Sequence, residues 1–537
     1  MNPPNRAAKS PSALPEFLPK LVTVWREGYG LADLRADVVA GLTVAIVALP
    51  LSMAIAIASG VGPERGLFTA IIGGFLVSLL GGSRFQVGGP AGAFIVLVSA
   101  CVAQIGVPGL ILATFLSGGM LVALAVLRAG SYVRYIPYPV TLGFTAGIAV
   151  IIFVSQIKDL GGLTLAADPG EVLAKLEALW AARGTISLSA LGVAGGTIAL
   201  IVGIKRLAPA LPNLLLAVVA GTLAAIIFSL PVETIYGRFG DLPRMVPAPS
   251  LPTLSWGLVQ GALPWAASFT LLGAIESLLS AVVADGMSGT RHRPNAELLA
   301  QGVANMGSAL FGGLCVTGTI ARTATNVRAG SHGPMSGLLH AVFVLVFMIV
   351  AAPLAGYIPL ACLAGVLAIV AWNMIEKAEI WDVIRHSRAD AVVLVATFLL
   401  VVFRDLTAGI VVGFALAGLV FIHRMSGHIQ GGAAAPDPGL DTVVHPLTGP
   451  FFFGAAARLG GELEQMAHQP KVFVLDLTQV PYIDSSGAHW LEGLSRKMAR
   501  RGGKLVLLGA RPEVQIVLVA AGLTGALAGP AVAPEAG

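Results

Sequence analysis

The chain has 537 residues, of which 56% are hydrophobic and only 11% are charged, and its formal net charge is +5. A soluble protein of this composition would aggregate, and so small a net charge gives no support for nucleic-acid binding. The composition therefore indicates a membrane protein whose basic excess lies in cytoplasmic loops.

The N-terminal 35 residues are polar and rich in proline, and no signal-peptide cleavage site follows a short apolar core. We expect residues 1–35 to form a cytoplasmic N-terminal segment. Apolar stretches long enough to cross a bilayer recur from there to residue 425, and we count about 14 of them. Their predicted starts lie near Ala40, Gly66, Gln86, Pro108, Pro139, Thr185, Pro212, Gly261, Ala296, Ile320, Met335, Pro359, Ala391 and Thr407.

The distribution of basic residues supports this count. With the N-terminus inside, the cytoplasmic connections contain Arg128, Arg134, Lys205, Arg206, Arg291, Arg293, Lys377, Arg385, Arg388 and Arg424. Short external connections are poorer in Lys and Arg, as the positive-inside rule requires. We predict a multi-pass protein of the bacterial inner (plasma) membrane with both termini in the cytoplasm. The stretch 171–183 is expected to be an amphipathic helix at the outer interface.

Two of the apolar segments are interrupted by glycines at matching places. The first reads Gly81-Gly82 and, a few residues later, Gly88-Gly89-Pro90-Ala91, while the second starts at Gly312-Gly313. A shift of 231 residues superposes the two Gly-Gly pairs, so the third and tenth segments become counterparts. With seven segments in each half, counterparts run in opposite directions, which is the pattern of an inverted repeat.

Each interrupted segment is expected to be a short extended stretch followed by a half-helix. Two half-helix N-termini that meet near the membrane centre offer free N–H groups and positive dipole ends, which suit an anion. Alternatively, the glycines only let helices pack closely. Because two clusters match in spacing, we predict an anion site formed by Gly88, Gly89, Pro90, Ala91, Thr319, Ile320, Ala321 and Arg322.

Two ionisable residues lie deep within apolar sequence. Arg322 would be costly there unless it were paired or faced an aqueous cavity, so we predict that it holds the anion. Glu276, in the middle of the eighth segment, is predicted to carry a proton or to help to hold Na⁺, with Ser280 one turn later on the same face. The alternative is a fixed ion pair between Glu276 and Arg322 that braces the bundle.

Other chemistry has little support in the sequence. The cysteines Cys101, Cys315 and Cys362 lie in apolar segments at spacings that suit neither disulfides nor a metal site. His292 is expected to be a loop residue, and His340 a core residue with satisfied hydrogen bonds. The chain has no P-loop, no Cys/His metal pattern and no serine-hydrolase motif. We predict no enzyme activity, no metal and no cofactor other than a coupling ion.

Motifs spread along the chain, at residues 35–44, 49–50, 66–68, 81–84, 276–279, 295–302 and 322–326, resemble those of the SulP sulfate-permease family, also called solute carrier family 26. The resemblance covers about residues 16–530. It implies a uracil-permease-like fold in a transport domain over residues 36–425, with a core domain (segments 1–4 and 8–11) and a gate domain (segments 5–7 and 12–14). It also implies movement of the core against the gate, usually in a homodimer.

The resemblance also bears on single residues. Glu276 matches by position the acidic residue that helps to bind Na⁺ in similar bacterial bicarbonate transporters, where Asp is more familiar. Ala321 stands where animal relatives often have Ser, and Leu51 stands where many members have Gln. Both departures remove a polar group near the expected site, so the resemblance does not identify the anion.

After a linker over residues 426–439, the chain takes on the pattern of a soluble α/β unit. Strands are predicted at 471–477 and 504–508, and helices near 487–500 and 511–521.

The stretch 480–487 resembles the conserved loop of the STAS domain, which implies a cytoplasmic STAS domain over residues 440–530. Ser485 falls where anti-sigma-factor antagonists with this domain are phosphorylated, and it is a candidate regulatory residue. The alternative is that Asp484 and the serines only cap the following helix.

These features lead to one main hypothesis of function. The chain is predicted to be a secondary active transporter that moves a small anion (sulfate, bicarbonate or a dicarboxylate) by alternating access, in symport with H⁺ or Na⁺ through Glu276. The alternatives are an uncoupled anion channel or exchanger, and a membrane-tethered signalling module in which the STAS domain is the working part. The expected partners are the anion, membrane lipid and a second copy of the chain.

Overall fold

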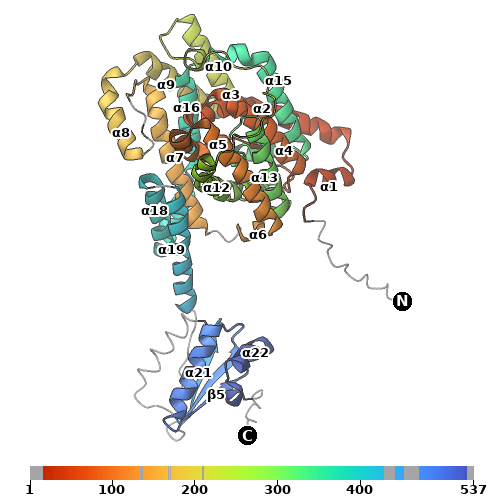
Figure 1. Cartoon of the computed structure of the whole chain (residues 1–537), viewed down its shortest axis with the longest axis vertical. Helices are drawn as coiled ribbons and strands as arrows, with labels where there is room; N and C mark the ends of the chain where they lie inside the picture. Colours follow the sequence, from red (N-terminus) through yellow and green to blue (C-terminus); the bar gives the residue numbers. More distant parts are fainter. Residues whose placement is uncertain are drawn as a thin grey trace. The chain divides into compact units, whose positions relative to one another are not determined.

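Long helices make up most of the chain, as its apolar composition predicts (Figure 1). The computed structural model describes residues 16–133, 137–166, 169, 171–208, 211–404, 406–427, 442–452 and 471–528. It divides into two units, Met1–Phe414 and Ala415–Gly537. Several predicted features lie outside the described residues: residues 1–15 of the N-terminal segment, Arg134, residues 428–439 of the linker, and residues 440–441, 453–470 and 529–530 of the STAS range.

The first unit consists of helices joined by short connections, with two short strands between them. Its elements are, in chain order, α1 (Lys20–Arg26), α2 (Leu31–Ala58), α3 (Pro63–Phe68), the π-helical turn η1 (Thr69–Gly73), α4 (Gly74–Leu80), β1 (Gly88–Gly89), the 3-10 turn η2 (Gly92–Phe94), α5 (Ile95–Val126), α6 (Gly130–Val133), α7 (Tyr138–Gly161), α8 (Val172–Ala181), the 3-10 turn η3 (Ala182–Thr185), α9 (Leu188–Leu207), α10 (Asn213–Ile227), α11 (Ile235–Phe239), α12 (Trp256–Ser288), α13 (Pro294–Leu310), β2 (Thr317–Gly318), α14 (Ile320–Arg328), α15 (Met335–Ala355), α16 (Leu360–Met374), α17 (Lys377–His386), α18 (Arg388–Phe403) and α19 (Leu406–Gly427), which continues into the second unit.

The predicted segments correspond to these elements in chain order. In the described part of the chain, nine helices are long and apolar enough to cross a membrane. Helices α3 and α4 with η1 form one segment, while α5 is kinked at Gly106, where φ is 70°, two residues before Pro108. Gly takes this backbone conformation at little cost and Pro lacks an N–H donor, so the pair separates the third and fourth segments.

The helices of the first unit pack in two groups. In the first group α5 packs against α12 and α13, α2 packs against α15, and α4 joins these two sets through α13 and α15. In the second group α7 packs against α16 and α18, and α9 packs against α10 and α16. The first group contains helices that the family resemblance assigns to the core domain, and the second contains helices that it assigns to the gate domain. The exact domain boundaries remain a prediction. The predicted amphipathic helix over residues 171–183 is present as α8.

The second unit contains a parallel sheet in the order β3-β4-β5, formed by β3 (Thr442–Thr448), β4 (Val472–Gln479) and β5 (Lys504–Leu508). Its helices are α21 (Ser485–Ala499), α22 (Pro512–Ala520) and the 3-10 turn η4 (Thr524–Ala526). The side chains of Phe473, Leu475, Leu491, Leu507 and Leu518 are buried together in its core. The predicted strands and helices of this α/β unit are thereby confirmed.

Candidate anion site

The two interrupted segments meet in an antiparallel strand pair. Gly88 of β1 lies opposite Gly318 of β2, and Gly89 lies opposite Thr317. β1 leads through η2 into α5, and β2 leads through Thr319 into α14. Because the two strands are antiparallel, the two half-helices follow from opposite ends of one short sheet.

Side chains of the opposite half lie against the backbone of this strand pair, in space that a Cβ would occupy. A Cβ on Gly89 would collide with the guanidinium of Arg322, and a Cβ on Gly318 would collide with the side-chain amide of Gln86. The absence of a Cβ at both glycines leaves room for polar side chains that cross from one half of the repeat to the other. This favours the site interpretation over general helix packing.

Arg322 is the largest of the fully buried side chains, with 1% of its surface exposed. Its Nη2 donates to Ser52 Oγ of α2 at 3.0 Å and to the carbonyl of Pro90 at 3.3 Å, and its Nη1 lies 3.5 Å from the carbonyl of Gly88. These contacts hold the positively charged guanidinium of Arg322, a residue of α14, beside the start of α5. Nε has no hydrogen-bond partner among the described residues.

Glu276 does not pair with Arg322. No ion pair joins the two residues in the described part of the chain, and Oε2 of Glu276 is buried without a hydrogen-bond partner there. The fixed ion pair that the sequence left open is therefore not formed. An unpartnered carboxylate oxygen inside a helical bundle needs a proton, a cation or water to satisfy it.

Serines of α12 hold the second strand in place. Ser277 Oγ lies 2.8 Å from Thr317 Oγ1 and 3.4 Å from the backbone nitrogen of Gly318, which donates to it. Ser280, predicted beside Glu276 as part of the ion site, instead donates to Thr323 Oγ1 at 3.1 Å. The segment that carries Glu276 is thus connected directly to β2 and α14.

Two reciprocal hydrogen bonds anchor the stretches that precede the strands. The N–H of Ser83 donates to Glu297 Oε2 of α13 at 3.0 Å, and the N–H of Leu314 donates to Thr69 Oγ1 of η1 at 2.6 Å. Ser83 and Leu314 are counterparts under the shift of 231 residues. Each stretch is therefore held by a side chain of the other half of the repeat. Glu297 belongs to the helix that precedes β2, and Thr69 belongs to the segment that precedes β1.

Loss of one anchor should destabilise the fold. Glu297 is fully buried and also accepts from Gln301 Nε2 at 2.9 Å, so Glu297→Ala leaves several buried donors without a partner. We expect the free energy of unfolding to fall by about 2–3 kcal/mol. Thermal unfolding of the purified protein measures this. Glu177→Ala, at an exposed position of α8, is the control and should change stability by less than about 0.5 kcal/mol. Equal stability of both variants would contradict the anchor role.

The structure brings most of the predicted anion-site residues together. Gly88, Gly89, Pro90, Ala91, Thr319 and Arg322 are buried, Ile320 is half-buried, and Ala321 is exposed. Thr319 Oγ1 is a further buried atom without a partner in the described residues. Four further residues of this region carried no recognisable signal in the sequence. Ser52 bonds to Arg322, Gln86 lies against Gly318, and Thr69 and Glu297 anchor the stretches before the strands.

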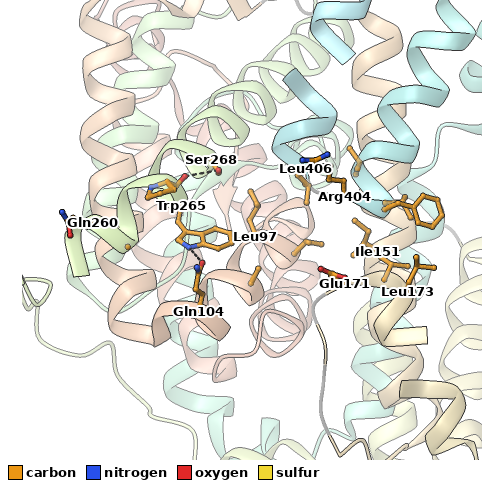
Figure 2. A pocket seen from close by; sticks show the side chains of 18 residues that line it. Leu97, Gln104, Ile151, Glu171, Leu173, Gln260, Trp265, Ser268, Arg404 and Leu406 are labelled. Atoms are coloured by element: carbon orange, nitrogen blue, oxygen red, sulfur yellow. Dashed lines mark hydrogen bonds between the residues drawn. The ribbon is translucent and has the colours of Figure 1, made fainter. Parts of the chain in front are cut away.

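A separate cavity of about 670 Å³ lies between the two groups of helices (Figure 2). Residues of α5 and α12 line one side, where Trp265 Nε1 donates to Gln104 Oε1 at 3.0 Å, and residues of α7, α8, α18 and α19 complete it. Figure 2 shows Arg404 and Leu406 across the cavity from Gln104. In the described part of the chain, no predicted anion-site residue lines it.

Comparison with known proteins identifies the family. Residues 34–397 match the Sulfate permease family, and residues 436–529 match the STAS domain. The first match covers more than half of the chain. The chain belongs to the sulfate permease family. This is a family of transporters and not of enzymes, in agreement with the prediction from sequence.

Relatives of this sulfate permease family member cover nearly its whole length. It is 39% identical over 508 residues to a Bacillus subtilis (strain 168) protein named "Putative sulfate transporter YvdB". This match covers 93% of this chain and 95% of the relative. It is 30% identical over 516 residues to the bicarbonate transporter BicA of a Picosynechococcus species, with 90% of each chain covered.

A solved structure shows the same fold. The murine Slc26a9 anion transporter superposes with a TM-score of 0.85 over 98% of this chain and 93% of that one, at 18% identity. This likeness concerns the fold alone. The prediction of a multi-pass helical membrane protein followed by an α/β STAS domain is confirmed.

Proposed function

We propose that this sulfate permease family member is a secondary active transporter that moves a small anion by alternating access. The observation that carries the proposal is the antiparallel pairing of β1 with β2, since it brings two half-helix starts together. The guanidinium of Arg322 is held at the same place by the carbonyls of Gly88 and Pro90. Two positive dipole ends and one guanidinium form an environment suited to a single small anion.

The substrate class is a small oxyanion or carboxylate. Guanidinium nitrogens and backbone N–H groups are donors that match the oxygens of sulfate, bicarbonate and dicarboxylates alike. The two relatives, one named as a sulfate transporter and one as a bicarbonate transporter, support the same substrate class. Ala321 and Ile320 border the site with apolar groups, so the donors come from Arg322 and the backbone.

Coupling is assigned to Glu276. Two observations support this: Oε2 of Glu276 is buried without a partner among the described residues, and the neighbouring Ser277 contacts both residues of β2, the strand that leads into α14. Binding of H⁺ or Na⁺ there would satisfy the buried oxygen. Ser280 contributes by holding Thr323 rather than by contact with the ion. The cytoplasmic position of both termini and the homodimer remain predictions.

Reconstitution of the full chain into lipid vesicles tests the function. We expect saturable uptake of radiolabelled sulfate, bicarbonate or fumarate that is driven by a proton or a sodium gradient. An anion conductance that ignores both gradients would overturn the carrier proposal in favour of a channel. Protein truncated after Arg424 tests the signalling hypothesis, in which the STAS domain is the working part, because that hypothesis fails if the truncated protein still transports the anion.

Ser485 is the regulatory candidate in the second unit. It is exposed at the first position of α21, next to Asp484, whose Oδ1 accepts from the N–H of Gly487 at 2.6 Å. The predicted cap is therefore present, and a phosphate at Ser485 would lie at the positive end of the helix. We expect mass spectrometry of the protein from its own cells to find phosphate that Ser485→Ala removes and Ser486→Ala does not. Phosphate confined to Ser486, or none, would contradict this role.

A further inference from the structure

His340 is a buried histidine that the proposed transport cycle has not used. It lies in the second turn of α15, none of its surface is exposed, and neither ring nitrogen has a hydrogen-bond partner among the described residues. The sequence-based expectation of a core histidine with satisfied hydrogen bonds is therefore wrong. A neutral imidazole carries one N–H and one acceptor nitrogen, and leaving both unpaired inside a protein is costly enough to need an explanation.

The surroundings of the ring connect it to the anion site. A Cβ on Gly74 would lie 2.9 Å from the carbonyl oxygen of Gly88 and 3.8 Å from His340 Nδ1, so both groups border one small space beside that glycine. The same carbonyl of Gly88 lies 3.5 Å from Arg322 Nη1. The charge of Arg322 also acts on the ring electrostatically.

Few other charges lie on the elements that pack against α15. These elements are α2, α3, η1 and α4, and neither η1 nor α4 carries a charged residue. The charged residues on α2 and α3 are Asp33, Arg35, Asp37, Glu64 and Arg65, and α14 adds Arg322 and Arg328. Asp37 accepts hydrogen bonds from the N–H groups of His332 and Gly333, and Arg65 donates one to the carbonyl of Gly312.

We propose that His340 is a protonation site coupled to anion binding at Arg322, an inference that rests on the proposed function and adds a second coupling group to it. A proton taken from water onto an imidazole nitrogen makes His340 positive. Beside an unneutralised Arg322, this second positive charge is unfavourable in a medium of low polarity. An anion against Arg322 removes the repulsion, so anion and proton each raise the affinity for the other.

The sign of the pH dependence follows from this linkage. Protonated His340 adds an attractive charge near the anion, so affinity for the anion rises as the pH falls. Coupling between two sites typically changes affinity by about 5-fold or more. At the alkaline end His340 is neutral and contributes little.

Sulfate binding to the purified full chain tests the proposal, because sulfate keeps its charge over the pH range of the experiment. We expect the wild-type affinity to rise about 5-fold or more as the pH falls from about 8 to 4. His340→Gln should match wild type at the alkaline end and lose most of the rise, as should His340→Asn. The control His386→Gln, on exposed α17, should keep the wild-type profile.

Glu276→Gln separates the two coupling groups. If His340 is coupled to the anion, this variant keeps a pH-dependent sulfate affinity that His340→Gln lacks. A rise that survives in His340→Gln and His340→Asn, or that vanishes only in Glu276→Gln, would overturn the His340 proposal and leave the proposed function intact. Failure of wild type to bind sulfate, bicarbonate or fumarate at any pH would instead remove the proposed function, and the His340 proposal with it.

Discussion

Arg322→Ala is expected to weaken anion binding by about 100-fold or more and to reduce uptake into vesicles to the background level. A hydrogen bond to a charged group is worth about 1.5–3 kcal/mol, and a guanidinium offers two of them to one oxyanion. The variant also removes the positive charge that the carbonyls of Gly88 and Pro90 hold at the start of α5. Binding of sulfate and bicarbonate to purified protein, followed by thermal shift, measures the effect.

Two further variants separate charge from structure. Arg322→Lys keeps the charge but loses the planar fork, so we expect affinity between those of wild type and Arg322→Ala. Arg328→Ala removes an exposed arginine from the other end of the same helix and should leave binding unchanged. Unfolding of each variant without anion gives its stability, and a stable Arg322→Ala that binds as wild type would remove Arg322 from the site.

The interrupted segments were predictable because their signal is local. Gly-Gly pairs, a following proline or small residue, and a fixed shift between halves are properties of short stretches. The count of seven segments in each half gave the inverted orientation, and the antiparallel pairing of β1 with β2 agrees with it. The strands and helices of the second unit were predictable for the same reason, since strand and helix periodicities can be recognised within about ten residues.

The contacts that hold the strands were not predictable from the sequence. Ser83 and Glu297 are 214 residues apart, and Arg322 and Ser52 are 270 apart, so no local pattern connects them. Glu297 lies in a stretch that the family resemblance includes, but its role as an anchor depends on how two segments of opposite halves pack. Thr69 is one of many threonines in apolar helices, where a hydroxyl commonly bonds to its own helix.

The partners of Arg322 show where reasoning about charge alone falls short. A buried arginine in a membrane segment suggests either a carboxylate or an anion as its partner. The guanidinium instead uses backbone carbonyls and one serine hydroxyl, which leave its positive charge uncancelled. An arginine held in this way keeps its attraction for an anion, whereas an ion pair with Glu276 would have neutralised it.

Glu276→Gln is expected to lower gradient-driven anion accumulation at least about 10-fold, while anion exchange across the vesicle membrane continues. Glutamine keeps the shape of the side chain but neither takes up a proton nor supplies a negative charge to Na⁺. Because Ser277 next to it bonds to Thr317 and Gly318, the coupling ion acts where β2 is held to α12. Uptake with only a proton gradient, and then with only a sodium gradient, identifies the ion in the wild type.

A matched control uses another acidic residue that lies away from the strands. Glu379→Gln changes an exposed glutamate of α17 and should accumulate anion as wild type does. If Glu276→Gln accumulates anion to the wild-type level under the same gradient, the carboxylate is not the coupling group, and its buried unpartnered oxygen needs another explanation. If instead it loses accumulation and exchange together while still binding sulfate, Glu276 is needed for the movement of the loaded carrier. The two outcomes differ because coupling concerns only net transport, whereas exchange requires the anion-loaded form to cross in both directions.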